Sequence, residues 1–155
     1  MKKLCTLLVA LLVLLLSCNK EGFDGNLNSN EYLIFGKFYS ECVGNCVNLY
    51  KIEDQKLYRD DLNWGLPDEI PFQSKALDSA KFEIAKILIE AFPTALLKSN
   101  KRRYGCPDCA DQGGFYIELK ENGERNIWLI DVFDIEQNLT IINYKNKIDE
   151  VLRGL

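Results

Sequence analysis

Four cysteines carry the chemistry that this sequence offers. They form two close pairs, Cys42 with Cys46 and Cys106 with Cys109, whose members are separated by three and two residues. Thiols at such spacings form disulfides, supply thiolates to a zinc ion or take part in thiol redox chemistry. The chain has no histidine, which excludes histidine-dependent nucleophiles and histidine-ligated metal sites.

Disulfides are the interpretation that we favour. An even number of cysteines in an exported domain is typical of an oxidising compartment, and the export signal is described below. Three connectivities are open. Local bridges, Cys42–Cys46 and Cys106–Cys109, would close small loops, whereas bridges between the pairs would constrain the unfolded chain more, by about 2–4 kcal/mol each.

A zinc site is the first alternative. All four cysteines would then act as tetrahedral thiolate ligands, which two pairs at these spacings are able to provide. In an oxidising envelope, however, disulfide formation competes with zinc before the site is complete. We therefore expect no cofactor, with zinc as the alternative.

Thiol redox chemistry is the second alternative. The segment Cys106-Pro107-Asp108-Cys109 resembles the Cys-x-x-Cys motif of thioredoxin-like oxidoreductases. Those proteins need a helix that begins at the first cysteine, because the helix N-terminus lowers the pKa of the thiol. Here a basic segment, residues 98–103, precedes the motif, and two glycines and a predicted strand follow it. This context favours a structural bridge.

The N-terminus is predicted to be an export signal. Two lysines follow Met1, and residues 4–16 are almost wholly apolar. This run is shorter than the roughly 20 residues that span a bilayer and is typical of a signal peptide. The segment Leu15-Leu16-Ser17-Cys18 resembles the lipobox of bacterial lipoproteins. The resemblance implies that the chain is cut before Cys18, whose thiol carries a diacylglycerol and whose new amino group is usually acylated.

Lipidation of Cys18 would hold the protein on a membrane, since each buried CH₂ contributes about 0.8 kcal/mol. Position 19 is Asn rather than Asp, so the inner-membrane retention signal of some lipoproteins is absent. We expect an outer-membrane lipoprotein of the cell envelope, on its periplasmic face or at the cell surface. The predicted organisation is a signal peptide over residues 1–17, a lipidated flexible tether over 18–30 and a single domain over 31–155.

The charge balance excludes one class of partner. The chain has 155 residues with 19 basic and 23 acidic side chains, and its net charge is −4. Removal of the signal takes away Lys2 and Lys3, so the net charge becomes −6. This acidic balance argues against a nucleic-acid partner.

The elements that position the cysteines are predicted from periodicity and turn signals. Strands are expected over residues 32–39, 47–53 and 56–59, a helix over 78–92, a hairpin over 115–131 and a helix over 138–153. Asp78 or Ser79 is suited to cap the first helix, and Ile84 and Ile87 widen its apolar face. The order β-β-β-α-β-β-α favours an α+β domain, with an antiparallel sheet of about five strands and two helices on one face.

The connection of residues 60–74 contains two prolines and a glycine, so an irregular loop is expected. Its apolar residues are predicted to pack under the domain, and these are Trp64, Leu66, Ile70 and Phe72.

The predicted hairpin has a readable register. Asn122-Gly123 supplies the positive φ that a tight turn needs. A two-residue loop would place Glu121 opposite Glu124, and these like charges repel. We therefore predict a three-residue loop of residues 121–123, which pairs Ile117 with Ile127 on one face and Tyr116 with Trp128 on the other.

The first cysteine pair carries a further resemblance. The segment Cys42-Val43-Gly44-Asn45-Cys46 is similar to the Cys-x-Gly-x-Cys opening of a bacterial envelope family of unknown function. In that family the motif lies between two strands, and a helix and a later hairpin follow. The resemblance extends over residues 32–152 and implies a fold but no activity.

Two classes of function fit these observations. The first is a small lipid-anchored binding module for a protein or another envelope component, and it predicts an exposed apolar patch beside bridged, inert cysteines. The second is a thiol-redox or zinc-binding protein, and it predicts that Cys106 and Cys109 are exposed beside the basic segment. No residue is assigned a catalytic role.

Overall fold

The structure is a computed structural model, and it describes residues 23–155 of the chain. The predicted signal peptide and Cys18 lie outside these residues. Within the described range, no helix has the length and apolar character that crossing a membrane requires.

Residues 23–155 form one mixed sheet with helices packed against it. The strands are β1 Tyr32–Phe38, β2 Val47–Glu53, β3 Lys56–Arg59, β4 Arg103–Tyr104, β5 Gly114–Glu121 and β6 Glu124–Asp131. The helices are α2 Ser79–Ala85, α3 Ile87–Glu90, α4 Thr94–Lys98 and α5 Leu139–Gly154. The strands lie in the order β3-β2-β1-β5-β6-β4. All neighbouring strands are antiparallel except β4 and β6, which are parallel.

The α+β class is confirmed, and the prediction of about five strands and two helices is roughly right but not exact. The sixth strand, β4, begins at Arg103, the last residue of the basic segment, where no strand was predicted. Arg103 and Tyr104 pair with Leu129 and Ile130 of β6, and the buried ring of Tyr104 holds this short strand against the core. A pairing of two residues leaves no periodic pattern in a sequence.

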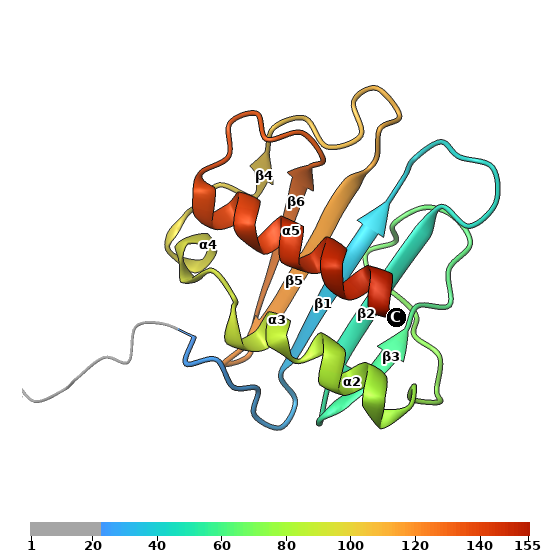
Figure 1. Ribbon diagram of the computed structural model, residues 1–155, viewed down its shortest axis with the longest axis vertical. Helices are drawn as coiled ribbons and strands as arrows, with labels where there is room; N and C mark the ends of the chain where they lie inside the picture. The colour runs from blue at the N-terminus through green and yellow to red at the C-terminus, as the bar shows by residue number, and fades with distance from the viewer. Residues whose placement is uncertain (1–22) are drawn as a thin grey trace, which may run out of the picture.

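Helices α2, α3 and α5 cover one face of the sheet (Figure 1). Alternate strand residues point towards these helices, and together they form the main core. The predicted cap is confirmed, since the carboxylate of Asp78 accepts a hydrogen bond from Lys81 N–H at 3.0 Å. Asn138 caps α5 in the same way, through Ile141 N–H at 3.0 Å.

The single helix predicted over residues 78–92 is divided at Lys86 into α2 and α3. The N–H of Ile89 donates to the carbonyl of Lys86 at 2.9 Å, so this hydrogen bond spans three residues instead of four. Ile84 and Ile87, which the predicted helix placed on its apolar face, are 41% and 40% exposed.

The β5–β6 hairpin differs by one residue from the predicted register. Asn122 and Gly123 form a two-residue loop with φ of 53° and 83°, so Glu121 pairs with Glu124. The repulsion that was expected to prevent this pairing is weak, because Glu124 is exposed and salt screens its charge.

Burial of β6 explains why this register is preferred. The observed register turns Trp128 and Ile130, both 0% exposed, towards the helices beside Ile117. A slip of one residue would turn both side chains to the opposite face. Burial of one such side chain contributes about 1.5–3 kcal/mol, whereas an interaction between two exposed charges amounts to about 1 kcal/mol or less.

The opposite face of the sheet is covered in part by the loop of residues 60–74. The buried carboxylate of Asp60 fixes the start of this loop, because it accepts hydrogen bonds from Leu49 N–H (2.7 Å) and Leu62 N–H (3.0 Å). Three of the four apolar residues predicted to pack beneath the domain do so, namely Leu66, Ile70 and Phe72. For Trp64 the prediction was wrong, since this residue is 70% exposed.

The predicted flexible tether, residues 18–30, packs against the domain over its described part. Phe23 is buried, and its ring centroid lies 5.4 Å from that of Phe92. Further along, the carboxylate of Glu31 accepts a hydrogen bond from Asn122 N–H at 2.9 Å. The segment is polar and contains glycine, which suggested a linker, and in its described part Phe23 and Leu27 pack against the main core.

Close contact between β1 and β2 yields a stability prediction. At Gly36, a Cβ atom would lie 2.1 Å from the carbonyl oxygen of Asn48, and φ is +151°. We expect Gly36→Ala to lower the free energy of unfolding by about 3 kcal/mol or more. The control is Gly44→Ala, where φ is +102° but no atom lies within 4 Å, so a loss of about 1 kcal/mol is expected. Urea unfolding followed by tryptophan fluorescence measures both, and equal losses would contradict the steric explanation.

Candidate binding surface

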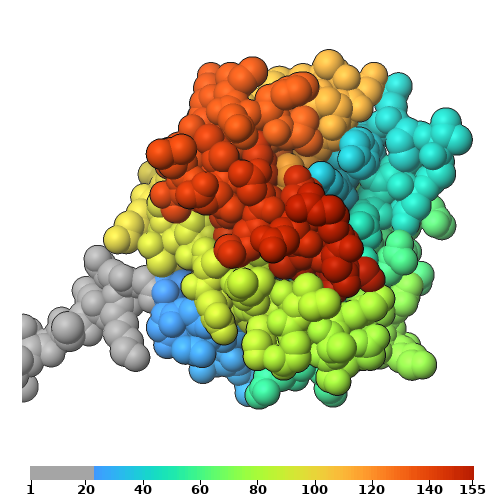
Figure 2. Space-filling view, viewed as in Figure 1, coloured from blue at the N-terminus to red at the C-terminus, as the bar shows by residue number. Residues whose placement is uncertain are grey.

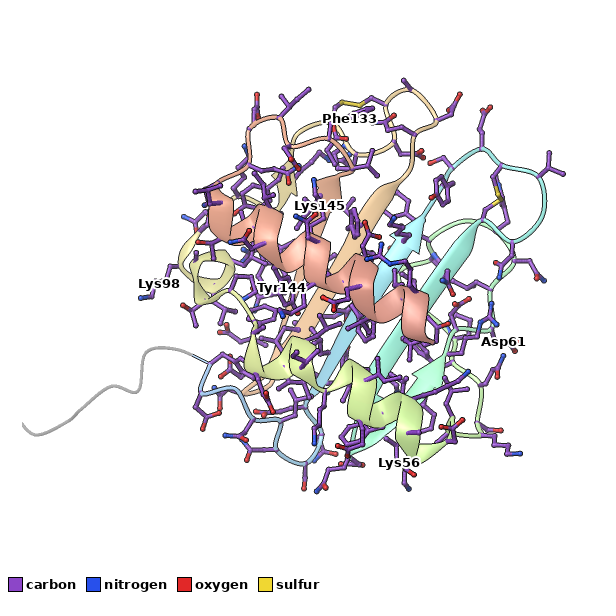
Figure 3. The ribbon with its side chains drawn as sticks, viewed as in Figure 1. Lys56, Asp61, Lys98, Phe133, Tyr144 and Lys145 are labelled. Carbon is purple, nitrogen blue, oxygen red and sulfur yellow. A yellow bond between two sulfur atoms is a disulfide. The ribbon has the colours of Figure 1, made fainter. Side chains whose placement is uncertain are left out.

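Both cysteine pairs lie at one end of the sheet. The bridge Cys42–Cys46 closes the loop between β1 and β2, and the bridge Cys106–Cys109 closes the turn that precedes β5. Phe38 at the end of β1 pairs with Gly114 at the start of β5, which brings the two loops together. Figure 3 shows both sulfur–sulfur bonds at this end. The disulfides are therefore the local pair among the three predicted connectivities.

Four segments meet around the disulfides, and we name them the loop platform. They are residues 39–46, 61–66, 105–113 and 131–137. Figure 2 shows residues 131–137 and 105–113 side by side along the upper edge of the molecule, with residues 39–46 beside them. The platform is thus built from chain segments that are far apart in the sequence.

The zinc alternative is not supported. Sulfur atoms joined in disulfides are no longer available as thiolate ligands. Residues 23–155 also contain no group of three or more cysteine or acidic side chains placed to hold a metal ion.

The surroundings of the second bridge do not suit thiol redox chemistry either. Cys106 and Cys109 are exposed, as that alternative predicts. However, residues 107–110 form a turn and no helix begins at Cys106. The neighbouring groups are also acidic, since the N–H of Cys106 donates to the carboxylate of Asp131 at 2.8 Å. Reactive thiols are instead found in electropositive surroundings or at a helix N-terminus.

Asp131 and Lys145 brace one side of the platform. One oxygen of Asp131 accepts from Cys106 N–H and the other from Phe133 N–H at 3.0 Å. The buried ammonium of Lys145, on α5, donates to the carbonyls of Asp131 (3.1 Å) and Val132 (2.9 Å). It also forms an ion pair with Asp134 at 2.7 Å. Figure 3 shows Lys145 on α5 near the segment that carries Phe133.

Asp108 joins the second disulfide turn to the first cysteine loop. Its carboxylate accepts hydrogen bonds from Ser40 N–H at 2.6 Å and from Gly113 N–H at 2.8 Å. The carbonyl of Ser40 in turn accepts from the indole N–H of Trp64 at 3.0 Å. A continuous series of hydrogen bonds and disulfides therefore holds all four segments of the platform.

The two aspartates are held in their ionised form. Burial alone would raise the pKa of Asp108, but the hydrogen bonds from Ser40 and Gly113 lower it below its usual value of 3.8. Burial opposes ionisation of Asp131 in the same way. Its hydrogen bonds from Phe133, Cys106 and Gln112, together with Lys145, lower the pKa nevertheless. Both carboxylates thus act as acceptors for backbone N–H groups.

Apolar side chains are exposed on the platform. Seven large hydrophobic residues within 23–155 are exposed, and four of them lie on these loops. They are Val43 at 106%, Trp64 at 70%, Phe133 at 56% and Ile135 at 64%. Exposed apolar side chains gathered on one part of a small protein indicate an interaction site.

The platform also carries an excess of negative charge. Its four segments contain seven acidic residues and no lysine or arginine. Two of the seven form ion pairs with lysines from outside these segments, Asp134 with Lys145 and Glu136 with Lys101. The acidic residues are Glu41, Asp61, Asp108, Asp111, Asp131, Asp134 and Glu136. This concentration of charge is not visible in the sequence, because each segment alone contributes only one to three charges and the segments come together only in the fold.

The opposite face of the sheet contains a second polar cluster, which sequence reasoning missed. Glu118 is 0% exposed and accepts hydrogen bonds from the hydroxyl groups of Tyr32 (2.7 Å) and Tyr116. It also forms an ion pair with Arg125. Burial would raise the pKa of Glu118, but these contacts lower it below 4.5. A carboxylate with these partners stabilises the sheet and is not available as a base.

No protein-family model matches this chain, and no curated protein is detectably similar to it in sequence. The resemblances to bacterial lipoproteins and to the Cys-x-Gly-x-Cys envelope family therefore stay predictions, and the function has to be inferred from the site.

The role of Asp108 yields a prediction with a defined pH dependence. Its pKa is lower in the folded protein than in the unfolded chain, so it stabilises the fold above about pH 4, and this contribution is lost as the pH falls further. We expect Asp108→Asn to lower the free energy of unfolding by about 1 kcal/mol at pH 7. The variant should also lose less stability than the parent between about pH 5 and pH 3.

Urea unfolding over this pH range measures both effects. The control is Glu41→Gln, which removes an exposed carboxylate from the same platform. An equal pH dependence in Asp108→Asn and the parent protein would contradict the assigned role.

Proposed function

We propose that this protein is a lipid-anchored protein of the cell envelope whose loop platform binds a partner protein with a basic and apolar surface. The observation that carries the proposal is that exposed apolar side chains and acidic side chains occur together at one end of the molecule. Exposed apolar side chains stand there among seven acidic residues on loops that disulfides and hydrogen bonds hold in place.

The bracing of the loops favours a binding role. A loop that is already ordered loses less conformational entropy when a partner docks, so more of the contact energy contributes to affinity. The disulfide Cys42–Cys46 closes the loop that carries Val43, and the disulfide Cys106–Cys109 closes the turn that precedes Asp111. The Ser40 carbonyl fixes the indole of Trp64 while 70% of that residue stays exposed. An aromatic ring held in this way is a typical anchor at protein interfaces.

The charge of the platform favours a protein over an anionic membrane. Five of the seven acidic side chains form no ion pair within residues 23–155, and they repel phospholipid head groups of like charge. They attract a partner with a basic rim, and this attraction chiefly increases the association rate and the specificity.

The path of the chain is compatible with an anchor at Cys18. The described chain begins at Phe23, and β1 then runs from Tyr32 beside the β5–β6 turn to Phe38 beside the disulfides. Five residues span at most about 18 Å. A lipid on Cys18 would therefore keep the β5–β6 turn near the bilayer, while the platform would lie at the far end of the strands.

Lipidation gives a direct prediction. Cys18→Ala should prevent attachment of lipid, so the variant keeps its signal and takes up no labelled palmitate. Intact mass and palmitate labelling in the native host measure this. The control is Cys5→Ala, because the predicted cleavage removes that residue with the signal. A Cys18→Ala protein that still carries lipid would contradict the predicted anchor.

The platform is tested by photocrosslinking in intact cells. We replace Trp64, Phe133 or Ile84 singly with p-benzoylphenylalanine in the full-length chain. We expect one and the same protein to be crosslinked from Trp64 and Phe133 and not from Ile84, which is exposed on α2. Adducts with lipid, or the same adduct from all three positions, would contradict the proposal.

The purified partner then provides a quantitative test. Phe133→Ser and Asp111→Lys should each weaken its binding by about tenfold or more, which corresponds to ~1.4 kcal/mol. Ile84→Ser is the matched control and should leave the dissociation constant unchanged. Addition of salt should reduce the association rate, because the partner is expected to be basic. Equal effects of Phe133→Ser and Ile84→Ser would argue against the platform.

A further inference from the structure

A second surface, opposite in charge to the platform, lies at the β6 side of the sheet. A shallow groove of about 390 Å³ is lined by Arg102, Arg103, Arg125, Ile127 and Leu129. We name it the arginine groove. Ile127 and Leu129 form its apolar floor on the sheet face that the helices leave uncovered, and both are only partly buried.

The guanidinium groups of the groove are held in place by the fold. Arg102 donates to the carbonyl of Ser99 and to the side chain of Asn126, each at 2.8 Å. Its guanidinium also lies 5.3 Å from the ring centre of Trp128. These contacts order the side chain without neutralising it, since all three partners are uncharged.

Two of the three positive charges are uncompensated. Arg125 forms an ion pair with the buried Glu118, but within residues 23–155 neither Arg102 nor Arg103 forms an ion pair. Arg103 is also exposed. The groove therefore presents a net positive charge beside an apolar floor, which complements a ligand that is acidic and partly apolar.

The edge of β6 is open beside this groove. β4 pairs with β6 only at Leu129 and Ile130. Glu121 and Glu124 flank the two-residue turn and form a hydrogen-bonded pair with each other. Hydrogen-bonded and non-hydrogen-bonded pairs alternate along an antiparallel hairpin, so Arg125 and Ile127 direct their backbone N–H and C=O groups away from β5. In the described part of the chain no strand pairs with these groups. An extended peptide is able to add to such an edge through main-chain hydrogen bonds.

The charges decide which peptide fits. A second copy of this edge would bring like arginines together, and charged side chains on an edge strand are a recognised protection against such pairing. An acidic strand meets no such barrier. We propose that the arginine groove binds an acidic extended peptide segment, which continues the sheet beside β6 below β4. Its carboxylates would lie against Arg102 and Arg103, and its alternate side chains would contact Ile127 and Leu129.

This site is separate from the loop platform and does not depend on the anchor. Its test uses the full mature chain in mild detergent and fluorescence anisotropy. The probe is a labelled nine-residue peptide of alternating glutamate and valine. Its controls are the lysine–valine peptide and a glutamate–valine peptide with N-methyl groups at alternate positions, which removes the N–H donors on one edge.

We expect binding of the glutamate–valine peptide only, weakened by salt. Arg103→Glu should weaken it by about tenfold or more. Lys147→Glu, the same charge change on α5, should leave it unchanged. Arg125 is not varied, because its loss would leave the buried Glu118 without its ion-pair partner and destabilise the fold.

Each alternative outcome would overturn a stated part of the proposal. Equal binding of the lysine–valine peptide would exclude recognition of acidic side chains, and equal binding of the N-methylated peptide would exclude pairing with β6. An equal loss in Arg103→Glu and Lys147→Glu would indicate attraction by overall charge alone. A dimer of the protein without peptide that Arg103→Glu dissociates would show that a second copy occupies the groove.

Discussion

The β5–β6 register, which the two-residue turn of Asn122 and Gly123 closes, is the constraint on which most of this structure depends. It decides which side chains of β6 face the helices. The same register places Arg125 beside Glu118 on the opposite face. A buried carboxylate without its partner costs about 3–5 kcal/mol. Core packing and charge neutralisation therefore select one register together, although they act on opposite faces of the sheet.

The register also determines which residues pair at the far end of the hairpin, where the loop platform lies. It pairs Gly114 with Asp131, the last residue of β6. Asp131 is thereby placed beside the second disulfide turn, where Cys106 N–H donates to its carboxylate. Gly105 lies against the same carboxylate, since a Cβ atom there would come within 2.6 Å of the Cβ of Asp131. A shift of one residue would remove this acceptor, so the register of the hairpin determines the arrangement of loops at this end.

Much of the fold could be predicted because its signals are local. The cap of the first helix and the two close cysteine spacings are each visible within a few residues, although the spacings alone left the disulfide connectivity open. The register was missed because it was judged from the charges of Glu121 and Glu124, whereas burial of Trp128 on the other side of the strand outweighs them. Most of the candidate site could not be predicted either, because it too depends on contacts between distant parts of the sequence. Its acidic and apolar residues lie on four segments whose proximity arises only from strand pairing, and only the cysteines marked two of them.

The net charge of the chain conceals a separation of charge that matters for binding. The chain is acidic on average, with a net charge of −4, and the platform loops contain no basic residue, whereas three arginines line the groove beside β6. A surface of a single sign would bind one class of partner, whereas this arrangement suits two partners of opposite charge on different parts of the molecule. It also affects association of the protein with itself. Edge-to-edge pairing through β6 brings like arginines together, but the platform of one copy is complementary to the groove of another. Any self-association driven by charge would therefore be head-to-side, a geometry that leaves one platform and one groove unoccupied at the ends of a chain of copies.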